Sequence, residues 1–214
     1  MHLIISESRR HGDANKKRPL KKLAQEDLKL VRRARRDRAA IEKIVTRLTP
    51  RIRHAVYLAV GGDQEADDLT HACLVEILDN LKGFKGTGSL EAWASSLSYR
   101  VLMRHLSRRR RSERTVSLVP VEIGISASMN PEMESERVRL RTRLVNHLQK
   151  LPDERRMALI LRLVYQHSVA EVAEMTGAPI NTVRDRIRVG LKELRQSILR
   201  DPEVKEFLKE ERHG

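Results

Sequence analysis

The stretch SVAEVAEMTGAPINTVRDRI, residues 168–187, decides the fold of the C-terminal part of the chain. Its first half repeats apolar residues at helical spacing, including Val169 and Val172, and so predicts a short amphipathic helix. Gly177 supplies the positive φ that a tight turn after a helix needs, and Pro179 suits the start of a second helix. The stretch therefore predicts two helices joined by a tight turn.

The second helix of this pair has two different faces. Its apolar residues recur at i, i+4, i+8 and i+11, which predicts a stripe facing the core: Val183, Ile187, Leu191 and Leu194. The opposite face carries the candidate DNA-binding residues Asn181, Thr182, Arg184, Asp185 and Arg188. In a helix-turn-helix this face enters the major groove, where arginine binds guanine and asparagine or threonine contacts bases or phosphates.

An ordinary helical hairpin with solvated arginines is the alternative to a DNA reader. A helix pair alone would favour that simpler interpretation. Here a small residue at the crossing, a glycine turn, a proline start and a basic face occur together within the stretch 168–187, and this combination favours the DNA reader.

The composition points to a helical protein with a polyanionic partner. The chain has 214 residues, with 43 Lys and Arg against 29 Asp and Glu, and carries a net charge of +14. Such an excess favours nucleic acid or an acidic membrane face as a partner. Hydrophobic residues make up 40% and aromatic residues only 3%, and few glycines or prolines interrupt the chain, which favours helices over sheets.

Several classes of site and location are disfavoured by the sequence. Cys73 is the only cysteine, so an internal disulfide and a cysteine-cluster zinc site are excluded. The eight histidines lack metal-ligand spacing, no Ser-His-Asp arrangement stands out, and the loop GFKGTG (83–88) lacks the GK[ST] ending of a nucleotide-binding loop. No apolar run is long enough for a signal peptide or a membrane span. We therefore expect no enzyme activity, cofactor, metal or membrane insertion, and a cytoplasmic location.

Charge and periodicity divide the chain into two helical domains. We expect a basic, partly disordered N-terminal extension, with residues 1–19 disordered and a helix starting in the twenties, where Leu23, Leu28, Leu30 and Val31 could share a face. The predicted segments are the extension (1–39), the first domain (40–111), a flexible linker (112–135), the second domain (136–200) and a tail (201–214). The predicted fold class is all-α.

The first domain reads as four helices. Pro50 separates the apolar faces of the first and second predicted helices, and the third runs through Cys73. The fourth starts after Ser89, which suits an N-cap, and ends in an arginine run. Cys73 is expected to be inert filling of the core. Trp93 is expected to be a core residue, whereas Phe84 is evenly balanced between the core and a base contact.

Two segments resemble bacterial sigma factors of the extracytoplasmic-function group. Residues 151–198 are similar to region 4, in the LP-x-E-R opening at 151–155, in S-x-x-E-x-A at 168–173 and in G-x-P-x-x-T-V at 177–183. Residues 41–111 are similar to region 2, in GDQEADDL at 62–69, in FKGTGSLEAW at 84–93 and in the arginine-ended helix 99–111. Both segments occur in the family's order.

The resemblance implies a sigma factor that binds core RNA polymerase, reads the upstream promoter element with region 4 and opens the downstream element with region 2. It implies polymerase-binding residues Asp67, Asp68, Leu69, His71 and Glu76. It implies a downstream DNA surface formed by Phe84, Lys85, Arg100, Arg104, Arg108 and Arg109. Promoter DNA and an anti-sigma factor are the further partners it implies.

Two rival functions follow from the same features. Family members often carry a Gln-Glu or Gln-Asp pair where this chain has His71 and Ala72, and Asn and Asp where it has Arg100 and Arg104. These differences would mark a sigma-like DNA-binding regulator that forms no active holoenzyme. A basic protein that binds RNA or DNA without sequence preference is the third alternative, and it predicts salt-sensitive, non-specific binding.

Overall fold

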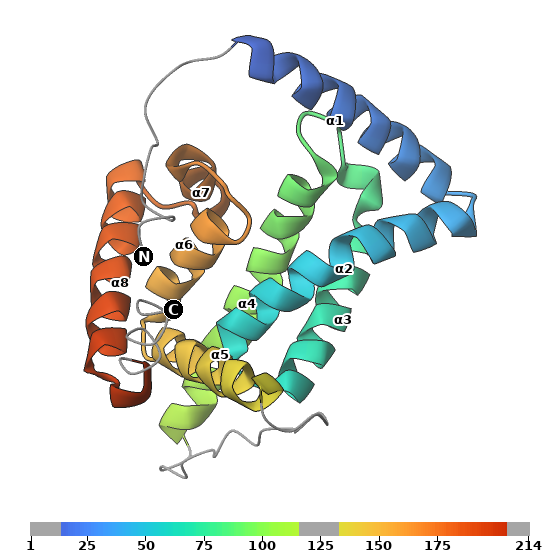
Figure 1. The fold of residues 1–214 in the computed structure, drawn as a ribbon. Coiled ribbons are helices and arrows are strands. Elements are labelled where there is room, and N and C mark those ends of the chain that lie inside the picture. The colour runs from blue at the N-terminus through green and yellow to red at the C-terminus, as the bar shows by residue number, and fades with distance from the viewer. Residues whose placement is uncertain (1–13, 116–132, 205–214) are drawn as a thin grey trace.

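The computed structural model of the protein describes residues 14–115 and 133–204, and every regular element in these two ranges is helical. The elements are α1 (Ala14–Ala34), α2 (Arg38–Val60), α3 (Asp63–Asp79), the 3₁₀ turn η1 (Leu81–Gly83), α4 (Leu90–Thr115), α5 (Met133–Gln149), α6 (Asp153–Leu163), α7 (Val169–Thr176) and α8 (Ile180–Arg200). Helices α2 to α4 form one group and α5 to α8 a second group beside it, while α1 lies across the first group (Figure 1). The all-α prediction is confirmed.

Helix α2 is one continuous helix, although the sequence predicts a break at Pro50. Ile44, Leu48 and Ile52 are all buried on one face that continues through the proline. Pro50 removes only one backbone hydrogen bond, and the apolar face on both sides of it is packed, so tertiary packing outweighs the local break. The helix ends where predicted, at Gly61, which has a left-handed φ of 89°.

Helix α1 begins earlier than the sequence predicts. It starts at Ala14, so the expectation that residues 14–19 are disordered is wrong, while residues 1–13 lie outside the described part of the chain. Its buried face is Ala24, Asp27, Val31 and Ala34, and Leu23 is 37% exposed. Of the predicted face, Val31 is buried and Leu28 and Leu30 pack against the core, whereas Leu23 does not, and the buried centre of the helix also contains small residues and one carboxylate.

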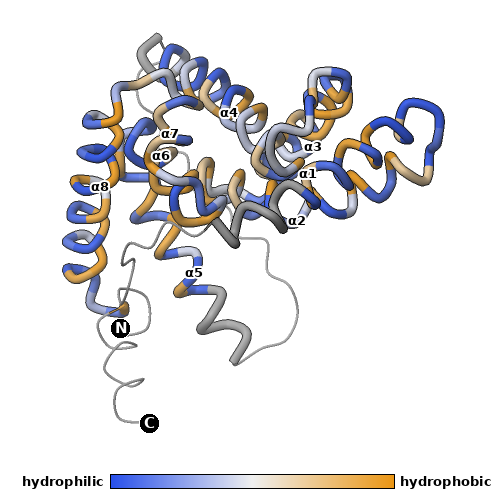
Figure 2. The backbone as a smooth tube through the Cα atoms, turned by 90° about the horizontal axis from the view of Figure 1, so that it is seen from above, coloured by the Kyte–Doolittle hydropathy of each residue, from blue (hydrophilic) through white to orange (hydrophobic). Residues whose placement is uncertain are grey.

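The second group is held by α6, whose residues 157–161 are all buried. Helix α8 crosses α6 at Gly190, where an added Cβ would lie 3.3 Å from Cδ1 of Leu159. The predicted core stripe of α8 is therefore correct at Val183, which is fully buried, but wrong at Leu191, which is 43% exposed. The helix turns its smallest residue inward at the crossing, and the tube colouring shows its apolar and polar residues alternating along α8 (Figure 2).

The two groups pack on each other through a shared core. One continuous cluster of buried apolar residues includes Ile52 and Leu102 of the first group and Ile160 and Val172 of the second. A buried hydrogen bond of 2.7 Å also joins Ser95 Oγ of α4 to His167 Nε2. Most of the predicted linker, residues 116–132, lies outside the described part of the chain, and so do residues 205–214 of the predicted tail. None of the described helices is long and apolar enough to cross a membrane.

Candidate nucleic-acid interface

The α7–α8 pair has the helix-turn-helix geometry that its sequence predicts. Ser168 and Glu171 form a capping box, in which Ser168 Oγ accepts the Glu171 N–H at 3.2 Å and Glu171 Oε2 accepts the Ser168 N–H at 2.7 Å. Gly177 adopts a left-handed φ of 66° after α7, as predicted. Val172 and Val183 are both fully buried, so each helix is fixed by one apolar face.

The opposite face of α8 lies open to solvent at its N-terminal end. All five predicted DNA-binding residues of this helix are exposed: Asn181, Thr182, Arg184, Asp185 and Arg188. Arg184 Nη1 donates to Asn181 Oδ1 at 3.0 Å, and Arg188 Nη2 lies 3.0 Å from Asp185 Oδ1. Exposed pairs of this kind contribute little stability, so the arginines can exchange them for base edges or phosphates at small cost.

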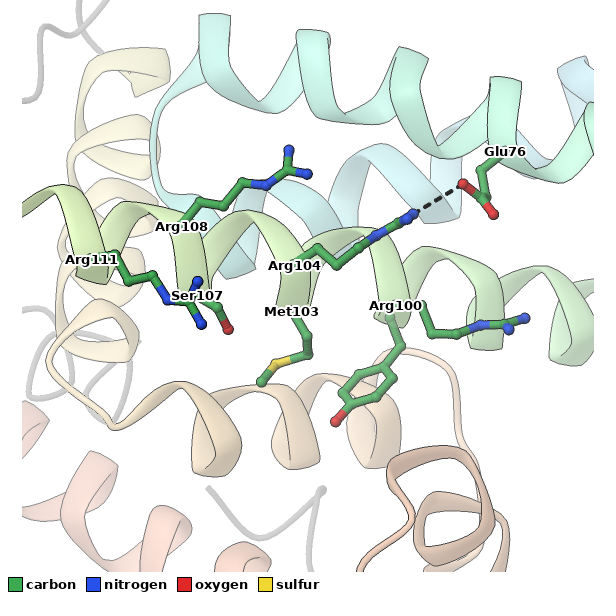
Figure 3. Close-up of a pocket in the computed structure, with 8 residues that line it drawn as sticks. Glu76, Arg100, Met103, Arg104, Ser107, Arg108 and Arg111 are labelled. Atoms are coloured by element: carbon green, nitrogen blue, oxygen red, sulfur yellow. Dashed lines mark hydrogen bonds and ion pairs between the residues drawn. The ribbon is translucent and has the colours of Figure 1, made fainter.

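A second basic surface follows α4. A groove of about 560 Å³ runs along this helix and is lined by Glu76, Tyr99, Arg100, Met103, Arg104, Ser107, Arg108 and Arg111. Figure 3 shows Arg104 and Arg108 extending from α4 toward α3, where Arg104 Nη2 lies 3.0 Å from Glu76 Oε2. The structure thus gathers three of the predicted DNA-binding residues of this region, Arg100, Arg104 and Arg108, along one groove.

The arginine run at the end of α4 divides among several directions. Arg109 is half-buried and turns back to α3, with Nη1 3.7 Å from Glu65 Oε2. Arg110 crosses to the second helical group, where its Nε lies 2.9 Å from Asp153 Oδ2. Arg108 and Arg111 line the groove. Of the predicted contacts in this run, Arg108 therefore faces the groove, whereas Arg109 is engaged within the fold.

The loop between η1 and α4 presents a lysine and hides its aromatic ring. Phe84 is 5% exposed and packs 5.6 Å from the ring of Trp93, so in this conformation Phe84 cannot stack on a base. Trp93 is partly buried against the core, in line with its prediction. Lys85 is exposed at the tip of the loop, and Gly86 follows with a positive φ of 70°. The geometry permits the predicted DNA contact at Lys85 but not at Phe84.

The predicted polymerase-binding residues fall on different sides of α3. Asp67, Asp68 and His71 are exposed, and Glu76 is partly exposed and paired with Arg104. Leu69 is only 8% exposed and belongs to the core, so its placement on the docking surface is wrong. Asp68, His71, Ala72 and Val75 follow the i, i+3, i+4, i+7 spacing of one helix face, and all four are exposed. We call this the outer face of α3.

Val75 is a functional candidate that the sequence analysis missed. Its side chain is 43% exposed on the same outer face as Asp68 and His71. Exposed apolar area surrounded by polar side chains has the anatomy of a protein-binding patch, an apolar centre within a polar rim. The helical spacing from Asp68 was the signal that could have identified it.

Chemistry at titratable groups is limited in the described residues. Burial raises the pKa of the Cys73 thiol to about 12, so the cysteine is a neutral core residue at physiological pH, as predicted. Across residues 14–115 and 133–204, no three His, Cys, Asp or Glu side chains gather in a way that could hold a metal ion. The basic faces of α4 and α8 are the prominent features of the surface.

Two family matches cover most of both helical groups. Residues 44–112 match the family described as Sigma-70 region 2, and residues 141–194 match the family described as Sigma-70, region 4. The chain is 25% identical over 162 residues to the ECF RNA polymerase sigma factor SigE of Mycolicibacterium smegmatis, which covers 74% of this chain and 63% of that protein. It is 27% identical over 188 residues to the RNA polymerase sigma-H factor of Pseudomonas aeruginosa, covering 83% of this chain and 97% of that protein.

Solved structures share the fold. The sigma factor RpoE of Bartonella quintana, solved in complex with the anti-sigma factor NepR, superposes with a TM-score of 0.56 at 18% identity and covers 75% of this chain and 97% of its own. CnrH, solved in complex with the cytosolic domain of CnrY, gives a TM-score of 0.59 at 20% identity over 82% of this chain and 98% of its own. The two family matches, in the order that a sigma factor requires and together covering more than half of the sequence, show that this chain belongs to the sigma-70 family and is a sigma factor of its extracytoplasmic-function group.

Proposed function

We propose that this sigma factor reads the upstream promoter element with the N-terminal half of α8. The support is the exposed face that carries Asn181, Arg184 and Arg188 at the start of a helix held in helix-turn-helix geometry. Arg184 and Arg188 pair with exposed side chains three residues away in the same helix, so a guanine edge can replace those partners. This face is the single observation that carries the proposal.

Region 2 supplies the surface for the downstream element. Lys85 lies at the tip of the loop before α4, and Arg100, Arg104 and Arg108 follow along the groove of that helix. A basic groove tracks the phosphates of a separated strand, and adjacent planar side chains allow bases to stack. Phe84 acts as an anchor of the loop in the core rather than as a base contact.

The outer face of α3 binds core RNA polymerase. Asp68 and His71 form its polar part and Val75 adds an apolar contact, while Asp67 and Glu76 lie at its edges and pair with Arg53 and Arg104 of the same chain. Carboxylates around a small apolar centre suit a basic surface on the partner, since complementary charge raises the association rate and fixes the orientation. Leu69 supports this face from below, because it is buried in the core.

An anti-sigma factor is the expected regulator, and the cytoplasm is the expected location. RpoE of Bartonella quintana and CnrH were both solved with partner proteins, NepR being named as an anti-sigma factor. The shared fold supports the same kind of partner for this chain. The protein functions by binding rather than by catalysis, as sigma factors do.

Transcription by a reconstituted holoenzyme tests the proposal. The full chain and purified core RNA polymerase are incubated with a library of genomic fragments, and transcripts are mapped by sequencing. We expect initiation at a small set of fragments that share an upstream motif. Binding to a shared motif without binding to core polymerase would instead identify a sigma-like regulator, and equal competition by random DNA would identify a non-specific nucleic-acid binder.

Matched substitutions on α8 connect the result to the structure. Arg184→Ala should change which fragments are selected, because it removes a candidate base contact. Lys192→Ala is the control, since Lys192 is exposed on the same helix but two turns further on, away from the reading end. An identical effect of both substitutions would contradict sequence reading by the N-terminal half of α8.

A further inference from the structure

We propose that Asp27 of α1 is a positioning residue that fixes the strand-engaging loop of region 2. The inference rests on the proposed function, in which Lys85 and the groove of α4 contact the separated downstream strand. The loop, residues 84–89, joins η1 to α4 and carries Lys85 at its exposed tip. Helix α1 lies outside residues 44–112, the segment that matches region 2, so this support comes from beyond that match.

The carboxylate of Asp27 is buried at the N-terminus of α4. Its side chain is 1% exposed, and its Oδ2 accepts the backbone N–H of Leu90 at 2.7 Å across 63 residues of sequence. Leu90 is the first residue of α4, while Ser89 Oγ accepts the N–H of Ala92 at 3.1 Å. Two side chains from different parts of the chain therefore cap this helix, and the negative charge of Asp27 is favourable at a helix N-terminus.

An arginine joins the same carboxylate to α2 and α4. Arg47 Nη1 lies 2.6 Å from Asp27 Oδ1, and Arg47 Nε lies 2.5 Å from Glu91 Oε1. A buried carboxylate is costly unless its oxygens are paired, and here both oxygens of Asp27 have a partner. The result is one polar junction that fixes α1, α2 and the start of α4 relative to one another.

The middle of the loop rests on α1 as well. Gly86 has a φ of 70°, and a Cβ at this position would lie 3.1 Å from Cβ and Cδ2 of Leu28 and 3.3 Å from the carbonyl oxygen of Ala24. On the other side of Lys85, Phe84 is buried against Trp93. Lys85 thus lies between Phe84, which is held by the core, and Gly86, which is held by α1.

The arrangement makes the loop a preformed surface. A loop that must be ordered when DNA binds loses affinity by the entropy of that ordering, and a loop held in place beforehand does not. Asp27 has no access to DNA itself, because it is buried. Its contribution to strand binding is therefore indirect, through the position of Leu90 and the contact between Gly86 and Leu28.

Asp27→Asn tests the proposal in the holoenzyme formed with core RNA polymerase. The substitution keeps the size of the side chain but removes the charge that pairs with Arg47. Four quantities are measured at a temperature well below the unfolding midpoint of the variant: affinity for core polymerase, affinity of the holoenzyme for upstream-element duplex, affinity for a single-stranded oligonucleotide of the downstream element, and permanganate reactivity of the opened promoter. Glu26→Gln is the matched control, because Glu26 is the exposed neighbour on α1.

We expect a selective loss at the downstream strand. Asp27→Asn should weaken single-strand binding by about fivefold or more and reduce promoter opening, while core and upstream binding stay within about twofold of the wild type. Leu28→Ala removes the side chain that Gly86 packs against and leaves the charge of Asp27 in place. It should cause a smaller loss in the same two assays. Glu26→Gln should change none of the four.

Uniform loss in all four measurements would overturn the inference, since it would show that Asp27 only stabilises the fold. Unchanged single-strand binding would also overturn it. If Asp27→Asn does not fold, Leu28→Ala decides by the same criteria. A wild-type holoenzyme that neither binds nor opens the downstream strand would overturn the proposed function itself. A wild type and an Asp27→Asn variant that bind this strand equally well would overturn only the role of Asp27.

Discussion

The two DNA-facing surfaces of this sigma factor are built from contacts of different range. The reading face of α8 is held by contacts of short range: the capping box between Ser168 and Glu171, the turn at Gly177 and the packing of α8 on the nearby helix α6. The surface of region 2 is held by distant partners: Leu90 by Asp27, 63 residues away, and Glu91 by Arg47, 44 residues away. The first surface needs only α6 to α8, which follow one another in the sequence, whereas the second needs most of the first helical group in place.

This difference separates stability from recognition. Damage to the junction around Asp27 affects both the fold and the strand-engaging loop, because the same contacts serve both. Damage to the reading face of α8 affects recognition alone, because its exposed side chains contribute little to stability. The substitutions below test this contrast from the largest expected effect to the smallest.

Arg47→Met should destabilise the protein most, by about 2–3 kcal/mol. The change leaves the Asp27 carboxylate buried with the Leu90 N–H as its remaining partner. Loss of one partner of a buried ion pair lowers the free energy of unfolding more than loss of one partner of an exposed pair does. The estimate lies below the full range for buried pairs because Arg47 is 31% exposed. Urea unfolding followed by circular dichroism measures the effect on the full chain.

Arg33→Met is the control for this comparison. Arg33 also pairs with an aspartate, Asp37, but the two side chains are 67% and 36% exposed. Its loss should change the free energy of unfolding by less than about 1 kcal/mol. Equal effects of the two substitutions would show that the distant junction contributes no more than a surface pair, and the contrast between the two DNA-facing surfaces would then fail.

Arg184→Ala should leave stability unchanged and reduce discrimination at one base pair of the upstream element by about 1–3 kcal/mol. The side chain is exposed and contacts Asn181 within its own helix, so little folding energy depends on it. Holoenzyme binding to a set of single-base variants of the promoter measures the effect. Uniform weakening for every sequence would mark Arg184 as a phosphate contact instead.

The same contrast explains what the sequence could predict. Within residues 168–187 the structural signals lie close together in the sequence, so residue spacing predicts the capped α7, the turn at Gly177 and the exposed face of α8. Helix α5 begins at Met133, close to residue 136, the predicted start of the second domain, because a change in composition marks it. The all-α class and the family follow from patterns of this local kind.

Features set by packing could not be predicted in this way. The continuity of α2 through Pro50 depends on a buried face that spans the proline, and the inward position of Gly190 depends on where α6 crosses α8. Leu69 is predicted on a surface and Phe84 is left open between the core and a base contact, but both are buried, since the sequence of a helix or loop does not show which neighbour covers it. Asp27 looks like any charge in a basic stretch until its partner at Leu90 is known.

Ser168→Ala tests the local side of the comparison and should cost about 1 kcal/mol. The change removes the hydroxyl that accepts the Glu171 N–H, but leaves the buried contacts of Val172 and Val183 intact. Urea unfolding measures the cost. Ser112→Ala, at an exposed position near the end of α4, is the control and should have no measurable effect. A loss as large as that of Arg47→Met would show that local capping matters as much as the distant junction.

The smallest effect should be a pH dependence at His167, which joins the two helical groups. The ring is buried, it is bonded to Ser95 and stacked on Tyr165, and burial lowers its pKa below the usual value for histidine. Arg51 lowers this pKa further, while Glu171 raises it.

The unfolded chain therefore binds more protons at His167 than the folded one does, so stability is retained near neutral pH and falls as the pH drops below about 6.5. Other groups with shifted pKa values, including His54, titrate in the same interval, so the test is the difference between the wild type and His167→Gln. Urea unfolding of both proteins from about pH 7 to about pH 5.5 should give a steeper loss for the wild type, and His71→Gln, at an exposed position on α3, should behave as the wild type does. Parallel curves for the wild type and His167→Gln would mean that this contact, formed across 72 residues, does not depend on a neutral ring.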